Sequence, residues 1–426
     1  MGRSVKKLLI LLGILSFSVH VSAQIHGTAM GGISTVTSEG AIDTTRNPAL
    51  LGTISAATTS FYIMGNTYYN EDANPEFHTP VMDISSIEQS NDYYYAFSLF
   101  AGYARPSGRG ILGYSLSSKE NFYLRKKDTQ KIYGSIPNPT PPPTSLSFEQ
   151  TETTTTSEIN PTLSIAYGWK LSDNNYAGIQ LTTTPFLSNK KTDNNNSLGT
   201  SYSYTNQEYG VIIQPSFGLL LSGNDSQVGL RFIPSTIKCI KKKAEADFST
   251  TDLSYSAKWD FQQSEGPQIV AGGYAKILPQ TGIALEFGLL LPSSYTNTDI
   301  NVTDNPLPAI NHSSVTIHND TIINAKAGIQ YSFTETFECM AGAAFFHFIN
   351  TAGSSKSYGK GKFNLVLITF GLNYSLSSTV ILSTLLLINN SSFESYYHME
   401  DTISLDAKTK TNLWNITVGA GLSYRL

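Results

Sequence analysis

The last fifteen residues, NLWNITVGAGLSYRL (412–426), decide the fold class, because their side chains alternate in character. The apolar positions are Trp414, Ile416, Val418, Ala420, Leu422 and Tyr424, and polar or glycine residues stand between them. Successive side chains of a β-strand point to opposite faces, so the apolar set shares one face. A strand of about ten residues with lipid on one side and a polar lumen on the other has this pattern. The stretch therefore predicts a membrane-spanning β-strand.

The same alternation recurs upstream, in residues 177–182, 228–232, 282–291 and 323–332. Repeated period-two segments predict an all-β fold, a transmembrane antiparallel β-barrel. A soluble β-sandwich or propeller remains an alternative source of short strands and turns. Strands of such soluble folds rarely keep apolar residues on an exposed face, so the barrel is favoured.

Two kinds of connection separate these segments. Six tight turns, often with an aromatic residue just inside, are expected near residues 105–109, 172–175, 222–225, 278–281, 334–336 and 375–378. Seven longer polar connections are expected near residues 71–90, 126–150, 191–201, 243–254, 298–313, 351–362 and 393–407. Short turns beside an aromatic girdle are typical of a periplasmic rim, and long loops of the outer surface. Seven loops and six turns require fourteen strands, with both chain ends on the periplasmic side.

The first 23 residues have the features of a Sec signal peptide. They begin with basic residues (Arg3, Lys6, Lys7), continue with an apolar run over 8–21 and end in Val21-Ser22-Ala23. This order predicts cleavage before Gln24. The alternative is an N-terminal membrane anchor, but the apolar run is shorter than the roughly 17 to 25 residues of a spanning helix.

The composition excludes several other classes. Only 14% of the residues are charged, whereas about 25% is typical of soluble proteins. The formal net charge of −4 is too small to indicate a nucleic-acid partner, and no stripe of lysine and arginine with interleaved aromatic residues occurs. No HExxH, GxSxG or CxxC motif is found, so no catalytic residue, metal or cofactor is predicted. Glu335 and Glu338 belong to an expected turn and are interpreted as solvated side chains.

The chain contains two cysteines, Cys239 and Cys339. Cys239 lies about fourteen residues beyond the turn at 222–225, and Cys339 lies three residues beyond Thr336. At about 3.3 Å per residue, their heights in the barrel differ by far more than the roughly 7 Å that a disulfide allows between Cα atoms. Both are predicted to be free thiols.

A Gly-rich stretch (24–42) precedes the first expected strand and leads into DTTRNPALLG (43–52). A short N-terminal segment with an Asn47-Pro48-Ala49 triplet, followed by fourteen strands, resembles the FadL/TodX family of outer-membrane hydrophobic-compound transporters. The resemblance implies a hatch over 24–52 that the triplet ends, folded inside a barrel over 53–426. It also implies passive uptake of hydrophobic or amphipathic molecules of the fatty-acid or aromatic-hydrocarbon class, with a sideways exit at a kinked strand.

Physical arguments favour a plug independently of the family. A barrel of fourteen strands lies between the eight-stranded size that side chains fill and the sixteen-stranded size that holds a water channel, so an empty lumen leaks. Pro48 restricts its own backbone and that of Asn47, whose side chain can bond unpaired backbone groups. The alternative is that Asn-Pro only marks a turn into the first strand. A second functional class also stays open, in which a barrel of this type is a secretion-system accessory or a structural outer-membrane protein.

Charged side chains in the alternating segments are expected to face the lumen, because a charge near the middle of the lipid face costs roughly 2 to 4 kcal/mol. By parity this places Arg231, Glu286 and Lys326 inside, together with the apolar Leu290, Leu365 and Leu367. Two hypotheses follow. The cations pair with Glu286 or anchor hatch carbonyls, or else Arg231 or Lys326 holds the carboxylate of a ligand whose tail contacts the leucines.

The remaining expectations concern partners. The sequence CIKKK (239–243) is expected near the outer end of a strand, where it contacts lipopolysaccharide phosphates or forms a solvated basic loop edge. The Pro-rich stretch 137–145 is expected to break a strand and to lie in an exposed loop. The predicted partners are a hydrophobic or amphipathic small molecule, outer-membrane lipid and lipopolysaccharide. The protein is expected to be a monomer in the bacterial outer membrane.

Overall fold

The computed structural model describes residues 28–30, 32–78, 83–138, 144–197, 201–248, 253–297, 300–303, 315–319, 321–354, 357–399 and 405–425. The predicted signal peptide and its cleavage site lie outside these residues. Among the described residues, no helix has the length and the apolar character that crossing a membrane requires.

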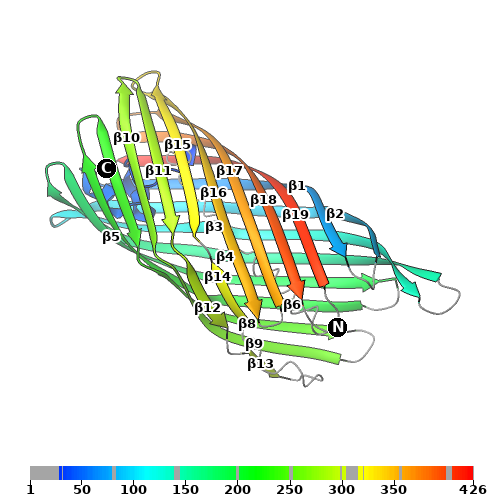
Figure 1. Cartoon of the computed structure of the whole chain (residues 1–426). Helices are drawn as coiled ribbons and strands as arrows, with labels where there is room; N and C mark the ends of the chain where they lie inside the picture. The colour runs from blue at the N-terminus through cyan, green and yellow to red at the C-terminus, as the bar shows by residue number, and fades with distance from the viewer. Residues whose placement is uncertain are drawn as a thin grey trace.

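Antiparallel strands make up almost all of the described chain (Figure 1). They are β1 (Thr58–His78), β2 (Asp83–Ser107), β3 (Gly110–Asn138), β4 (Thr144–Ser172), β5 (Asn175–Asn196), β6 (Ser201–Ser222), β7 (Ser226–Ile233), β8 (Thr236–Phe248), β9 (Leu253–Glu265) and β10 (Gln268–Leu278). They continue with β11 (Thr281–Leu290), β12 (Ser293–Asn297), β13 (Ile300–Thr303), β14 (Val315–Asn319), β15 (Ile322–Ser332), β16 (Phe337–Ser354), β17 (Ser357–Ser375), β18 (Val380–Met399) and β19 (Leu405–Arg425). The sheet closes on itself because β1 pairs with β19, with Thr58 opposite Arg425.

These segments form fourteen barrel strands, because four of the strands are interrupted. The interrupted strands are β7 with β8, β9 with β10, β11 with β12 and β13, and β14 with β15. Pro234, Pro267 and Pro292 stand at three of the breaks, where proline has no backbone N–H to give to a neighbouring strand. The predicted antiparallel barrel of about fourteen strands is confirmed, and the six tight turns lie where the sequence places them.

The strands are much longer than the predicted ten residues, and this corrects the expected long loops. Residues 126–150 were expected to form a loop, yet β3 and β4 pair continuously from Tyr123 opposite Ile159 to Asn138 opposite Thr144. Most of the other expected loops are likewise strand up to their tips, and much of 298–313 lies outside the described residues. Antiparallel pairing satisfies the backbone N–H and C=O groups of these polar stretches beyond the lipid, so a polar sequence does not by itself indicate a loop. Of the Pro-rich stretch 137–145, Pro137 and Asn138 end β3 and Thr144 and Ser145 begin β4, while residues 139–143 lie outside the described residues.

The outer face of the barrel is apolar. On β4, for example, Leu163 and Ile165 are 54% and 45% exposed, whereas the intervening Ser164 is buried. On β19, the alternation predicted for the C-terminal stretch is confirmed, since Trp414 and Val418 are exposed and Thr417 is buried. Cys239 and Cys339 are both free thiols, as predicted.

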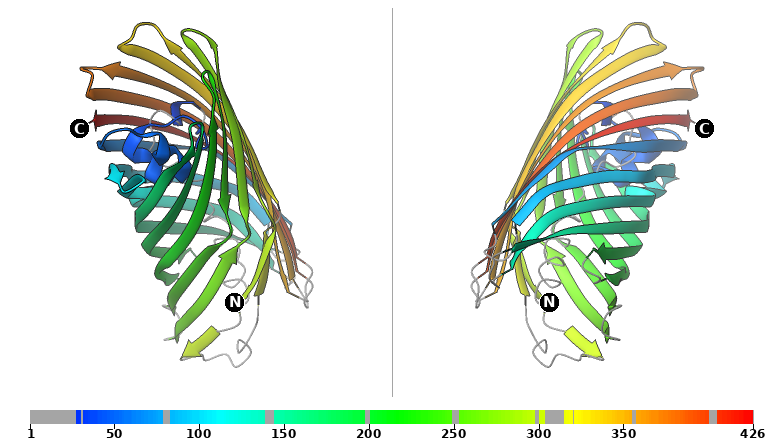
Figure 2. Two further views of the ribbon diagram at one scale, coloured as in Figure 1. Left: turned by 90° about the vertical axis from the view of Figure 1, so that its left-hand side faces the viewer. Right: turned by 90° about the vertical axis from the view of Figure 1, so that its right-hand side faces the viewer.

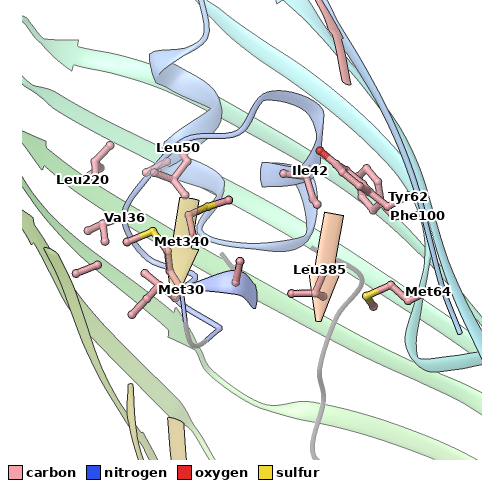
Figure 3. Close-up of a cluster of buried hydrophobic side chains, with 14 residues drawn as sticks. Met30, Val36, Ile42, Leu50, Tyr62, Met64, Phe100, Leu220, Met340 and Leu385 are labelled. Atoms are coloured by element: carbon pink, nitrogen blue, oxygen red, sulfur yellow. The ribbon is translucent and has the colours of Figure 1, made fainter. Parts of the chain in front are cut away.

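The N-terminal segment (residues 28–57) lies inside one end of this barrel, the end that holds the tight turns and the C-terminus (Figure 2). It contains two 3-10 helices, η1 (Gly40–Thr45) and η2 (Pro48–Thr53). Helix η1 contacts β1 to β5, and η2 contacts β3 to β6. The apolar side chains of the N-terminal segment pack against inward-facing side chains of several strands, so the segment supplies much of the core (Figure 3).

Candidate functional site: the lumen and its N-terminal segment

The N-terminal segment is organised around Arg46, whose side chain is completely buried. Its guanidinium donates hydrogen bonds to the carbonyls of Ile33 and Thr37 and forms ion pairs with Glu39 and Asp43. Burying a guanidinium is costly unless acceptors and counter-charges offset it, and these contacts supply them for its two Nη atoms. The sequence analysis did not identify Arg46, although a lone arginine directly before Asn-Pro in a Gly-rich stretch is a signal for it.

Asn47 connects this segment to the barrel wall. Its Oδ1 accepts from the Ala49 backbone N–H at 3.1 Å, which caps η2, and Pro48 takes the first helical position. Its Nδ2 donates to the carbonyl of Thr35 at 2.9 Å and to that of Leu219 on β6 at 3.1 Å. The triplet opens η2, and the remainder of η2 and residues 54–57 separate it from β1, so Asn-Pro does not simply turn the chain into the first strand.

Glycines on the inner face of the wall make room for the segment. At eight described glycines, an added Cβ would lie 1.9 to 2.5 Å from an atom of residues 29–48; they are Gly113, Gly168, Gly178, Gly218, Gly229, Gly272, Gly328 and Gly371. Real Cβ contacts essentially never come below 3.0 Å. These glycines come from eight different strands, and we call them the glycine seat. In the sequence, glycine recurs at positions that alternation assigns to the inner face of many strands, and this recurrence is the signal that predicts the glycine seat.

Glu286 and Lys326 stand opposite each other on β11 and β15, and both hold the N-terminal segment. Glu286 is completely buried, and its Oε2 accepts from the backbone N–H groups of Ser34 at 2.7 Å and Thr35 at 2.8 Å. The Lys326 ammonium lies 2.7 Å from Glu286 Oε1 and 2.7 Å from the carbonyl of Gly32. The two charges therefore compensate each other while satisfying backbone groups of the segment.

Arg231 is also inward, but it reaches the segment through a second side chain. Its Nη2 lies 3.0 Å from Oε1 of Gln180, and Gln180 Nε2 donates to the carbonyl of Thr44 at 2.6 Å. Ser216 donates to the same Gln180 oxygen at 2.7 Å. The geometry makes Arg231 a positioning group for Gln180, and Arg231 makes no hydrogen bond to Glu286 among the contacts described. The ligand-binding role given to the three charged residues stays a prediction.

Leu365 and Leu367 belong to an apolar cluster on the inner face of β16, β17 and β18. We call it the apolar patch; its members are Ala344, Phe346, Phe363, Leu365, Leu367 and Leu387. Leu367 is 3% exposed and Leu387 is 1% exposed, so water does not reach the middle of the patch. Leu290 faces the lumen by its alternation on β11, but it is not a member of this cluster.

The inner faces of β4, β5, β6 and β8 are polar. Ser188 donates to Glu158 at 3.2 Å, and Asn206 donates to Glu208, which also pairs with Lys242. Threonine hydroxyls face each other across β4 and β5, at Thr154 with Thr192. The lumen beyond the N-terminal segment thus has an apolar wall on β16 to β18 and a polar wall on these strands.

The wall is locally irregular at β3. The pairing of β3 breaks after Ser117 with β2 and after Ser118 with β4, and both ladders resume at Tyr123. On the adjacent pair, the ladder between β4 and β5 is interrupted between Ile159 and Leu163, at Pro161. A bulge and a proline both remove ladder hydrogen bonds, so the wall is weakened here.

One further cavity, of about 910 Å³, lies at the wall formed by β1, β2 and β16 to β19. Its lining is largely apolar and includes both the exposed Phe370, Leu386 and Val418 and the buried Met64, Met340 and Leu385. Among the described residues, no three His, Cys, Asp or Glu side chains are grouped as a metal site would require.

No protein-family profile and no curated protein matches this sequence. Solved structures do match the fold. The toluene transporter TodX of Pseudomonas putida superposes with a TM-score of 0.56 at 11% identity, covering 96% of this chain and 99% of that one. A FadL homologue of Pseudomonas aeruginosa gives a TM-score of 0.56 at 9% identity, covering 95% and 98%. The toluene transporter TbuX of Ralstonia pickettii gives 0.53 at 10% identity, covering 94% and 97%. The chain is an outer-membrane-type barrel that resembles the FadL/TodX family of hydrophobic-compound transporters in its fold.

Proposed function

We propose that this protein is an outer-membrane channel for passive uptake of hydrophobic or amphipathic small molecules, of the fatty-acid or aromatic-hydrocarbon class. The observation that carries the proposal is the apolar patch on the inner face of β16 to β18. Contact with lipid requires apolar side chains only on the outer face of a membrane barrel. An apolar cluster on the inner face is therefore suited to binding a hydrophobic ligand. Two of the structures with this fold are named toluene transporters.

The proposed route begins at the end of the barrel away from the tight turns and reaches the apolar patch. The N-terminal segment fills the lumen on the other side of the patch and acts as a hatch, so a ligand cannot continue straight through. The irregular wall after Ser118 of β3, with Pro161 beside it on β4, is the proposed sideways exit into the membrane. Fewer ladder hydrogen bonds have to break there than elsewhere in a continuous sheet.

Lys326 is the cation we assign to a ligand carboxylate, in preference to Arg231. Its ammonium lies 5.9 Å from the ring centroid of Phe346, a member of the apolar patch, and contacts the N-terminal segment on its other side. A carboxylate arriving at the patch would compete with Glu286 for this ammonium. Uptake and release of the segment would then be coupled. An uncharged aromatic ligand needs only the patch.

The test is binding of a fluorescent fatty acid to the purified barrel, with toluene as a competitor. Leu367→Asn places an amide in the patch and is expected to weaken binding ten- to a hundredfold, from about 1.5 to 3 kcal/mol of lost apolar burial. Leu171→Asn, at an exposed position beside a tight turn, is the matched control and should bind as wild type does. Melting temperatures recorded for both variants separate lost binding from lost folding.

Wild-type protein that binds neither ligand would contradict the proposal and favour the secretion-accessory role. Lys326→Met divides the ligand classes further. It should weaken binding of the fatty acid roughly ten- to a hundredfold, since a charge-assisted hydrogen bond contributes about 1.5 to 3 kcal/mol, and leave binding of toluene unaffected. Equal loss of both ligands would assign Lys326 a purely structural role.

A further inference from the structure

Asn324 is a polar side chain on the inner face of β15. Alternation along the strand places it there, because Ile323 is 51% exposed on the outer face whereas Asn324 is 7% exposed. Lys326, the next inward residue toward the tight turns, binds the carbonyl of Gly32. Asn324 therefore lies one inward position farther from the tight turns than the lysine that holds the N-terminal segment.

The strands on either side of β15 define the surroundings of the Asn324 amide. In strand register, Asn324 stands opposite Gly288 on β11 and Phe346 on β16. A Cβ added at Gly288 would lie 2.4 Å from Asn324 Nδ2, so the amide lies against the backbone of this glycine. Phe346 belongs to the apolar patch. The amide thus occupies the edge of the apolar patch, over a position that glycine leaves open.

The Oδ1 atom of Asn324 is buried and accepts no hydrogen bond within the part of the chain that the structure describes. A buried acceptor without a donor costs free energy, because it has given up its hydrogen bonds to water. The strand pairing does not require an amide here, since the facing residues are Gly288 and Phe346. A leucine, which has the same branched shape, would avoid the cost. The amide is therefore suited to recognise a hydrogen-bond donor that enters the lumen.

The neighbouring side chains restrict what this donor can be. Phe346 and Leu365 stand in the same row of the wall as Asn324 and provide apolar surface. The Lys326 ammonium lies 5.9 Å from the centroid of the Phe346 ring and repels a cationic donor. A carboxylate has no hydrogen to donate to Oδ1. A neutral hydroxyl on an apolar ring meets both conditions, because the ring can pack against Phe346 while the hydroxyl donates.

We propose that Asn324 recognises the hydroxyl group of an uncharged hydroxylated aromatic ligand, of the phenol class, whose ring lies against Phe346 and the apolar patch. The hydroxyl donates to Oδ1, which turns toward the lumen by rotation of the amide about its Cβ–Cγ bond, a torsion with a broad distribution. A phenol is uncharged at pH 7, so it needs no counter-charge from the protein. This inference rests on the proposed function and names a ligand class for the same site.

The test compares para-cresol with para-xylene, which has the same shape but no hydroxyl, by titration calorimetry on the purified barrel. Asn324→Leu is expected to weaken binding of para-cresol roughly tenfold, because the hydroxyl then leaves water without gaining an acceptor. Binding of para-xylene should be unchanged, since it needs only apolar surface. Para-methylanisole, which keeps the oxygen but has no hydroxyl hydrogen, should behave as para-xylene does. Asn324→Ala, which removes the amide without adding bulk, should show the same selective loss.

Asn415→Leu is the matched control. Asn415 on β19 lies between the exposed Trp414 and Ile416, so it also faces the lumen, and its Oδ1 likewise has no partner among the described residues. It stands opposite Asn389 on β18, not beside an aromatic ring. This variant should bind para-cresol as wild type does. Melting temperatures of the ligand-free proteins check the folding of every variant, and Asn324→Leu should melt no lower than wild type because it loses a buried unsatisfied acceptor.

The outcomes separate this inference from the proposed function. Equal changes for para-cresol and para-xylene in Asn324→Leu would overturn the role of Asn324 and leave the proposed channel intact. A loss of para-cresol binding in Asn415→Leu as large as that in Asn324→Leu would overturn it as well. Wild-type protein that binds the fluorescent fatty acid but none of the three aromatic compounds would refute this inference alone, whereas wild-type protein that binds none of these ligands would contradict the channel too.

Discussion

The two halves of the lumen are filled by different means. Beside the tight turns, the N-terminal segment fits against the glycine seat. It is fixed by hydrogen bonds that Asn47, Gln180 and Lys326 donate and by those that Glu286 accepts. Toward the other end, the lumen is lined by the apolar patch and by the polar inner faces of β4, β5, β6 and β8. The side chains of each surface have only their polarity in common. The filling of the first half therefore depends on contacts between individual atoms, whereas the lining of the second half depends on the polarity of its side chains. Substitutions should therefore have unequal effects in the two halves.

The largest effect is expected from Gly218→Val. A Cβ at this position would lie 1.9 Å from Asn47 Oδ1, so the segment has to leave its seat while the barrel strands remain paired. The variant should conduct ions in planar bilayers where wild type is closed, because an unplugged barrel of this size holds water.

Gly65→Val is the matched control, since a Cβ there has no atom within 4 Å. It should stay closed. A closed Gly218→Val barrel with wild-type stability would show that the seat does not depend on glycine.

The next effect concerns Glu286. Glu286→Gln leaves the Lys326 ammonium, whose side chain is only 12% exposed, without its counter-charge and is expected to destabilise the seated segment by about 3 to 5 kcal/mol. Hydrogen exchange at the amides of Ser34 and Thr35, which donate to this carboxylate, measures the loss directly. The double variant Glu286→Leu/Lys326→Met removes both charges and should recover part of the protection. Unchanged exchange in Glu286→Gln would contradict the role assigned to the pair.

A pH dependence should follow from Asp43, which belongs to the N-terminal segment and not to a spanning strand. Burial raises the pKa of its carboxyl to about 7, against the opposing attraction of Arg46. A raised pKa means that the seated segment prefers the protonated acid, so its stability is complete below about pH 4 and falls as the pH rises through 7. Protease resistance of the segment should show this fall. Asp43→Asn should flatten the profile, and a profile that is unchanged in the variant would refute the assignment.

The smallest effect is expected in the other half, from Leu367→Met. This substitution nearly conserves volume in an apolar patch, and such changes usually cost less than about 1.5 kcal/mol. Thermal unfolding should show a shift of a few degrees at most. A loss as large as that of Glu286→Gln would mean that the patch is fitted as closely as the seat, and the comparison between the two halves would fail.

Some of the site was predictable from residue type and parity. Glu286 and Lys326 were placed in the lumen because a charge on the lipid face is costly, and anchoring of segment carbonyls was one of the two roles considered for the cations. Arg231 was placed inward on the same ground, but its contact with Gln180 was not foreseen. The sequence analysis did not identify Arg46 or the glycine seat. An arginine before Asn-Pro and glycines at inward positions of many strands are signals for them, but neither signal tells which atoms these residues contact once the barrel has closed.

The sequence by itself determined the barrel, its tight turns and the side of the wall on which each residue stands. Every second side chain of a membrane-spanning strand faces lipid and has to be apolar, and this alternation can be recognised within a few residues of sequence. The tertiary structure alone decided which groups meet. Asn47 bonds a carbonyl 172 residues away and Lys326 one 294 residues away, and the lengths of the strands depend on their partners. Such contacts exist only once the barrel has closed around its N-terminal segment, because closure brings strands that are distant in the chain onto one lumen.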